Sequence, residues 1–139
     1  MAIKFDEIIG SVIVDSLVNS LSGSVSFLQV YDGTQPEIAG GTSGSCNLLV
    51  QFSGLAWDSA SFGSSALLDQ KTGTAGTSGT ATWARITEDT GIYIIDGNCG
   101  TASTCDFVIS NNVIAKNQII TLKKASIVFP PGWNDWTGW

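Results

Sequence analysis

Histidine is absent from this chain of 139 residues. Its absence removes the commonest general base and the commonest metal ligand, and it excludes both the Ser/His/Asp triad and the Cys/His nucleophile pair. Two pairs of adjacent carboxylates remain, Asp6/Glu7 and Glu88/Asp89. They fall at an expected helix start and in an expected turn, where solvated polar ends are the ordinary role. We therefore expect no catalytic residues and a protein that is not an enzyme.

Charged residues are also scarce, at 13% of the chain, and six Lys and Arg stand against twelve Asp and Glu. A net charge of −6 gives no basic surface for nucleic acid or for an anionic membrane. No apolar run approaches the length of about 18 residues that a membrane span needs. The first residues carry acids where a signal peptide carries positive charge. We expect no nucleic-acid or membrane partner, and synthesis in a cytoplasm without an export signal.

There are only three cysteines, Cys46, Cys99 and Cys105. Their odd number and wide spacing argue against a disulfide framework and against zinc ligation. A disulfide between Cys99 and Cys105 would close a short loop, and free or buried thiols are the alternative. The segments 32–33 and 96–98 offer oxygen ligands for calcium, but Asp-Gly is first a turn signal. We expect no metal and no cofactor.

One amphipathic helix is expected near the N-terminus, over residues 5–21. Acids at Asp6 and Glu7 favour the positive end of the helix dipole, and Gly23 is a plausible stop. The many β-branched residues leave a strand as the alternative. The apolar positions that recur at helical spacing are Ile8, Ile9, Val12, Ile13, Leu17, Val18 and Leu21.

After Gly23 the apolar period changes to two, which is typical of strands. Polar stretches at 33–45 and 69–79 are predicted as surface loops, and Trp57 and Phe62 as packing anchors. Strands are predicted at 24–31, 46–52, 80–86, 92–97, 106–110 and 118–129, with turns at 32–33, 87–91 and 111–112. This pattern predicts a mostly β fold: a single antiparallel β-sandwich, jelly-roll or Ig-like, with one N-terminal helix. The predicted domain covers residues 1–129, and residues 130–139 form a Pro/Trp-rich tail.

The last eleven residues hold three of the five tryptophans and are too rich in Pro and Gly for a helix or a central strand. Because each Trp ring could bury about 200 Å², we expect these side chains to pack on something. The tail either folds back onto its own domain, docks on a neighbouring subunit or forms a sugar-stacking platform. The interface candidates are Phe129, Trp133, Trp136 and Trp139 from the tail and Ile8 and Val12 from the helix.

Four motifs occur in a fixed order along residues 1–129. They are Met1-Ala2-Ile3-Lys4-Phe5 leading into Asp15-Ser16-Leu17, then Leu28-Gln29-Val30-Tyr31-Asp32-Gly33-Thr34-Gln35-Pro36, then Gly79-Thr80-Ala81-Thr82-Trp83-Ala84-Arg85-Ile86, and last Asn111-Asn112-Val113-Ile114 before Ile119-Ile120-Thr121-Leu122. With these motifs the chain resembles a family of small virion structural proteins of tailed phages and prophages that are similar to head decoration proteins. The tail from Trp133 onward is not part of that pattern.

The resemblance implies a component of the virion surface that is made in the host cytoplasm. The first hypothesis is a capsid decoration (cement) protein that binds the lattice of the major capsid protein as a homo-oligomer, with a trimer favoured. A tail, baseplate or fibre-associated structural protein is the second hypothesis. A carbohydrate-binding module, in which Trp133, Trp136 and Trp139 form an exposed stacking face, is the third.

Overall fold

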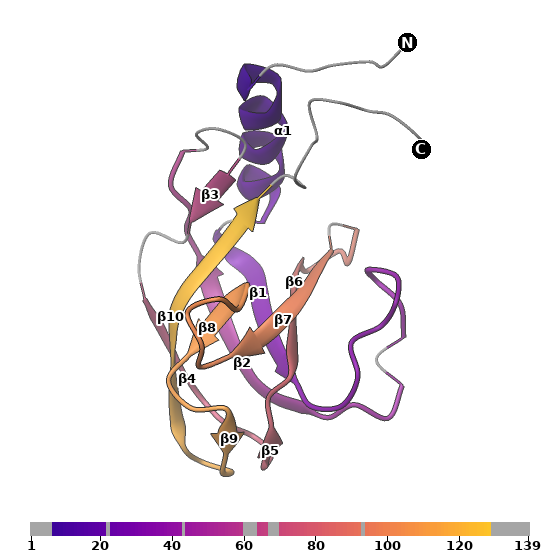
Figure 1. The fold of residues 1–139 in the computed structure, drawn as a ribbon, viewed down its shortest axis with the longest axis vertical. Coiled ribbons are helices and arrows are strands. Elements are labelled where there is room, and N and C mark those ends of the chain that lie inside the picture. Colours follow the sequence, from indigo (N-terminus) through magenta and orange to yellow (C-terminus); the bar gives the residue numbers. More distant parts are fainter. Residues whose placement is uncertain are drawn as a thin grey trace.

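The structure is a computed structural model that describes residues 7–21, 23–42, 44–59, 64–66, 70–92 and 94–128. Within these ranges the chain forms one helix, α1 (Glu7–Ser20), and ten strands (Figure 1). The strands are β1 (Gly23–Tyr31), β2 (Leu48–Leu55), β3 (Ser64–Ala66), β4 (Lys71–Thr74), β5 (Gly79–Thr80), β6 (Trp83–Glu88), β7 (Ile95–Gly100), β8 (Phe107–Ile109), β9 (Val113–Ile114) and β10 (Ile119–Val128). The predicted mostly β class and the predicted N-terminal helix are confirmed.

Eight of the strands form one sheet in the order β2-β1-β6-β7-β8-β10-β3, with β4 also paired to β10. Strands β5 and β9 form a separate two-stranded sheet. The length of β10 holds this arrangement together, because its ten residues pair with β8 on one side and with β4 and then β3 on the other. The pairing of β7 with β8 is parallel, so the sheet is not purely antiparallel as predicted.

The large sheet curls until β4 returns to β2, which makes it nearly closed. The amide of Gly76 donates a hydrogen bond of 2.9 Å to the carbonyl of Leu49 on β2. A Cβ placed on Gly73 would lie 2.8 Å from the carbonyl oxygen of Gln51, so only glycine permits this approach of β4 to β2. Among the described residues the strands therefore enclose the core in one nearly closed sheet, and the two facing sheets of the predicted sandwich are not seen.

The core lies inside this curled sheet and beneath the C-terminal half of α1. Val14 and Val18 of the helix and Leu21, just after its end, are buried, and the indole nitrogen of Trp57 donates a 3.1 Å hydrogen bond to the carbonyl of Leu21. Trp57 is thus confirmed as a packing anchor, while Phe62 lies outside the described residues. The main strand side chains of the core are Leu28, Val30, Leu49, Phe52, Leu55, Ala84, Ile86, Phe107, Ile109, Ile120, Leu122 and Ala125. Within the described part of the chain, no helix is long and apolar enough to cross a membrane.

The prediction of a polar loop over 69–79 is wrong in part, because β4 and the first residue of β5 lie there. The side chains of β4 alternate between half-buried and exposed. Its sequence, Lys-Thr-Gly-Thr, has no apolar period to mark it. The strand exists because its backbone pairs with β10, in register from Thr74 opposite Ile119 to Lys71 opposite Leu122. A partner distant in the sequence decides its conformation.

The three cysteines are free thiols, so the alternative of a disulfide between Cys99 and Cys105 is not what the structure holds. Cys99 is buried in the core, and Cys46 and Cys105 are partly exposed. Burial, with a smaller contribution from the nearby Cys105, raises the pKa of the Cys99 thiol from 9.0 to about 12. The folded chain therefore holds this proton over a pH range in which the unfolded chain releases it.

This difference predicts a pH dependence of stability. The contribution of Cys99 to the free energy of unfolding is fully present below about pH 9 and is lost as the pH rises towards about 12. Above about pH 9 the free energy of unfolding should fall by up to about 1.4 kcal/mol per pH unit because of this group. Urea unfolding of the reduced wild type and of Cys99→Ala at a series of pH values isolates the effect. The difference in free energy of unfolding between the two proteins should be constant near neutrality. Above about pH 9 it should shift in favour of Cys99→Ala. A difference that stays constant across the whole pH series would contradict the prediction.

Candidate functional site

Helix α1 has a buried half and an exposed half. Val14, Val18 and Leu21 pack into the core, whereas Val12 and Ile13 expose 61% and 42% of their surface. Figure 1 shows the helix rising beyond the end of the sheet, with only its lower turns beside the strands. Exposed apolar side chains on a helix whose other side is packed in the core are typical of a contact surface for another protein.

The structure places the predicted interface residues as follows. Val12 lies at the surface of α1, and Ile8 belongs to the same helix. The tail candidates Phe129, Trp133, Trp136 and Trp139 lie outside the described residues. The interface role of all six residues stays a prediction.

A group of interacting side chains that the sequence did not reveal lies on the outer face of β6 and β7. Arg85 and Asp96 face each other across the two strands. Their ion pair is bidentate, with Nε to Oδ1 at 2.7 Å and Nη2 to Oδ2 at 2.9 Å. Only 12% of the Arg85 side chain and 2% of the Asp96 side chain are exposed. The hydrogen bond to Asp96, opposed by burial, raises the pKa of the Arg85 guanidinium.

Two aromatic rings extend this group along the same face. Trp83 lies two residues before Arg85, so strand alternation puts both side chains on one side of β6. The ring of Tyr31, on β1, stacks on Trp83 with centroids 4.5 Å apart, and the Arg85 guanidinium lies 5.3 Å from the centroid of the Trp83 ring. Trp83 is fully buried, although it does not belong to the core cluster inside the sheet. Burial also raises the pKa of the Tyr31 hydroxyl.

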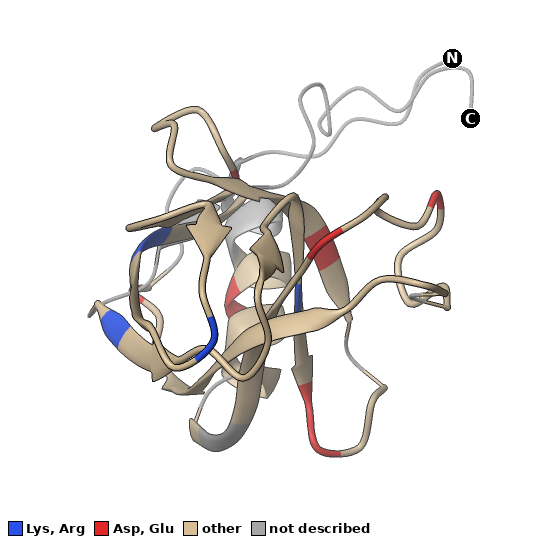
Figure 2. Cartoon of the chain, turned by 90° about the horizontal axis from the view of Figure 1, so that it is seen from below, with Lys and Arg blue, Asp and Glu red and all other residues tan. Residues whose placement is uncertain are grey.

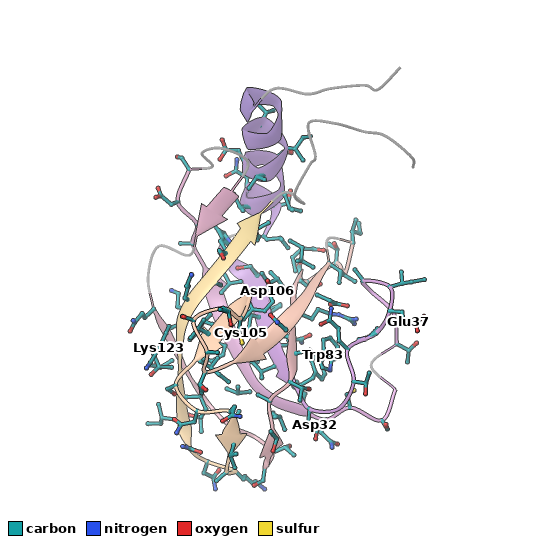
Figure 3. All side chains as sticks on the ribbon, viewed as in Figure 1. Asp32, Glu37, Trp83, Cys105, Asp106 and Lys123 are labelled. Carbon is teal, nitrogen blue, oxygen red and sulfur yellow. The ribbon has the colours of Figure 1, made fainter. Side chains whose placement is uncertain are left out.

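The loop that follows β1 covers this outer group. Arg85 Nη2 donates a 2.8 Å hydrogen bond to the carbonyl of Gly41, and the amide of Gly40 donates to Asp96 Oδ2 at 3.3 Å. At the start of the loop, the indole nitrogen of Trp83 donates to the carbonyl of Asp32 at 3.0 Å. In Figure 3 Trp83 lies beside the loop that carries Glu37. The stretch predicted as a plain surface loop is therefore pinned to the sheet by a buried ion pair.

The turn between β6 and β7 is built around Glu88, whose predicted role as a solvated turn residue is wrong. Its side chain is buried, and its carboxylate accepts hydrogen bonds of 2.8 Å from the amides of Thr90 and Ile92. The neighbouring Asp89 is exposed, as expected of a turn residue. Because Glu88 holds residues 90–92 in the turn, β7 starts only at Ile95 and not at the predicted residue 92.

The acids that might have formed a metal or catalytic site are engaged elsewhere. Asp32 accepts hydrogen bonds from the backbone and side-chain amides of Asn47 at 2.6 and 3.1 Å, and these bonds lower its pKa. Asp106 Oδ2 accepts from the amide of Asn98 at 3.1 Å. Among the described residues, no group of three Cys, Asp or Glu is placed to hold a metal ion. These carboxylates shape turns.

A half-open concavity with a volume of about 230 Å³ lies beside two of these acids. Its lining residues come from the start of β7, from the end of β10 and from the start of β8 with the preceding Asp106, which is labelled in Figure 3. Its lining combines Ile95, Asp96, Gly97, Asp106, Phe107, Ser126 and Ile127. Since Asp96 is bound by Arg85 and Asp106 by Asn98, the two carboxylates of this cavity are held as acceptors for protein donors.

A scan against protein-family models, a search of curated proteins and a search of solved structures each returned no match to this chain. The resemblance to virion proteins of tailed phages therefore stays a prediction, and the functional argument depends on the surfaces of the molecule.

Proposed function

We propose that this protein is a virion structural protein without catalytic activity, and that it decorates the capsid by binding the lattice of the major capsid protein. The observation that carries the proposal is the outer side of α1, where Val12 and Ile13 are exposed while Val14 and Val18 of the same helix are buried in the core. A contact element fixed in advance loses little conformational entropy on binding.

The rest of the molecule supports a scaffold role. One nearly closed sheet surrounds a continuous core, and its polar clusters fix loops and turns. Within this proposal the finer fold assignment, a jelly-roll or Ig-like sandwich, is retained as a prediction. A homo-oligomer, with a trimer favoured, belongs to the same proposal.

The test is co-sedimentation with undecorated heads of the phage that encodes the chain. Wild-type protein should pellet with the heads and saturate at a fixed ratio to the major capsid protein. The double variant Val12→Asp/Ile13→Asp should bind at least about 100-fold more weakly, because two apolar contacts of about 1.5 kcal/mol each are lost and two charges are buried.

The matched control is Thr72→Asp/Thr74→Asp, which adds the same two charges at exposed positions of β4. It should pellet like the wild type. Wild-type protein that stays in the supernatant at saturating head concentration would overturn the decoration role. Immunogold labelling of complete particles then distinguishes a tail or baseplate position, and quenching of Trp fluorescence by a glycan panel identifies a carbohydrate-binding module.

A further inference from the structure

Two of the three cysteines lie at the ends of the connection between β7 and β8, which folds back on itself. Cys99 of β7 is in register with Phe107, the first residue of β8, and Cys105 lies two residues before Phe107. The base of the connection is closed by two hydrogen bonds between Asn98 and Asp106. The amide of Asn98 donates to Asp106 Oδ2 at 3.1 Å, and the amide of Asp106 donates to Asn98 Oδ1 at 2.7 Å. The backbone therefore returns to the neighbourhood of Cys99 within a few residues.

The sulfur of Cys105 lies against the residue that follows Cys99. A Cβ placed on Gly100, the last residue of β7, would be only 3.1 Å from Cys105 Sγ, so the glycine leaves room for the sulfur. A turn holds the sulfur there, since the amide of Cys105 donates a 3.0 Å hydrogen bond to the carbonyl of Ala102. The two thiols are also close enough for their charges to interact, because Cys105 contributes to the raised pKa of Cys99. The two sulfurs are thus neighbours at the end of β7.

The two thiols differ in their access to solvent. Cys99 is only 5% exposed and belongs to the core, whereas Cys105 is partly exposed and follows the exposed residues 101–104. A small reagent can therefore reach Cys105 from solvent, and the sulfur of Cys99 can react through Cys105 without leaving the core. Cys46 belongs to a different part of the molecule, where its thiol donates to the carbonyl of Thr34 at 3.5 Å.

The segment that carries this pair has no cation of its own. Figure 2 shows how few Lys and Arg the chain has, and residues 95–109 contain none. Thiols that act in redox catalysis are usually activated by a nearby cation or by a helix N-terminus, which lowers their pKa. Without such a cation in the segment, the pair is suited to a structural change of redox state and not to repeated turnover.

We propose that Cys99 and Cys105 form a disulfide when the protein meets a small oxidising disulfide such as oxidised glutathione, and that this bond locks the connection between β7 and β8. The thiolate of Cys105 attacks one sulfur of the oxidant and releases the first glutathione thiol. The thiol of Cys99 then loses its proton and attacks the Cys105 sulfur of the mixed disulfide, which releases the second. Two protein thiols are oxidised and one glutathione disulfide is reduced to two thiols, so electrons and protons balance.

The lock would stay open in a reducing cytoplasm and close after the protein passes into oxidising surroundings. A disulfide constrains the unfolded chain, so the oxidised protein should unfold at a higher temperature than the reduced protein. The inference does not depend on the proposed capsid role, because the purified chain alone is enough to test it.

The experiment uses the whole chain with Cys46→Ser, so that only this pair can react. The protein is equilibrated in buffers of reduced and oxidised glutathione, both folded and unfolded in urea, and is then quenched with acid. Intact mass should show the loss of two hydrogen atoms with no bound glutathione, and peptide mapping should join Cys99 to Cys105. The effective concentration of the two thiols should be about 10-fold higher in the folded chain than in urea, because the fold holds the sulfurs together.

Three further variants in the same background test the order of the steps, and circular dichroism melting checks that each is folded. Cys99→Ser should stop at a mixed disulfide on Cys105. Cys105→Ser should react at least about 100-fold more slowly than the parent, because the remaining thiol is buried and protonated. Gly100→Ala should lower the effective concentration about 10-fold in the folded chain and leave it unchanged in urea, since the added methyl group displaces the Cys105 sulfur. An effective concentration that is no higher in the folded chain than in urea would refute the inference, as would glutathione that stays on Cys105 while Cys99 is present.

Discussion

Replacing Asp96 by alanine should lower the free energy of unfolding by about 3 kcal/mol, because it leaves the guanidinium of Arg85 without its carboxylate in a largely buried position. The amide of Gly40 loses its acceptor in the same step, so the loop after β1 should also loosen. Urea unfolding measures the first effect. Faster proteolytic cleavage within residues 33–42 measures the second.

Two further variants separate charge from shape. Asp96→Asn keeps one acceptor oxygen and should cost less, about 1–2 kcal/mol. Arg85→Met combined with Asp96→Ala removes both charges and should be more stable than Asp96→Ala alone, because no unpaired ion remains. A loss below about 1 kcal/mol for Asp96→Ala would show that the pair does not hold the loop in solution.

Replacing Trp57 by alanine should destabilise the protein by about 3–5 kcal/mol and release α1 from the sheet. The side chain is 9% exposed and belongs to the core, and its indole nitrogen bonds the carbonyl of Leu21 just after the end of the helix. Since Val14, Val18 and Leu21 pack in the same region, the cavity should lower the protection of the helix more than that of the strands. Urea unfolding and amide hydrogen exchange measure the two effects.

The comparison variant is Trp57→Phe, which keeps most of the aromatic packing and loses the hydrogen bond to Leu21. It should cost about 1–2 kcal/mol and leave the helix protected. If Trp57→Ala and Trp57→Phe lower the stability equally, the packing of this ring does not anchor the helix. In that case another contact would have to hold the C-terminal end of α1, on which the proposed capsid contact depends.

The helix and several strands could be predicted from the sequence with small errors. The helix expected over 5–21 is observed as Glu7–Ser20, and the strand expected over 24–31 is Gly23–Tyr31. These elements have a clear apolar period of their own, and one face of each is buried against the core. Strand β4 was missed because its residues carry no such period, and its pairing with β10 alone makes it a strand.

The candidate surfaces were predicted only in part. Val12 was recognised because it belongs to the apolar pattern of a helix, and the structure shows that it points away from the core. The pairing of Arg85 with Asp96 could not be predicted from the sequence. A turn at 87–91 followed by a strand from residue 92 implies a register for β6 and β7 that differs from the observed one. The burial of Glu88 depends on the same register.

The sequence by itself determined the β-rich class, the helix at the start and the positions of most turns, because periodicity and turn chemistry act over a few neighbouring residues. Only the tertiary structure decided that the sheet curls until β4 meets β2 and that a buried ion pair pins the loop after β1. Each of these features joins segments far apart in the chain. Their contacts depend on strand order and register, which local residue patterns do not encode.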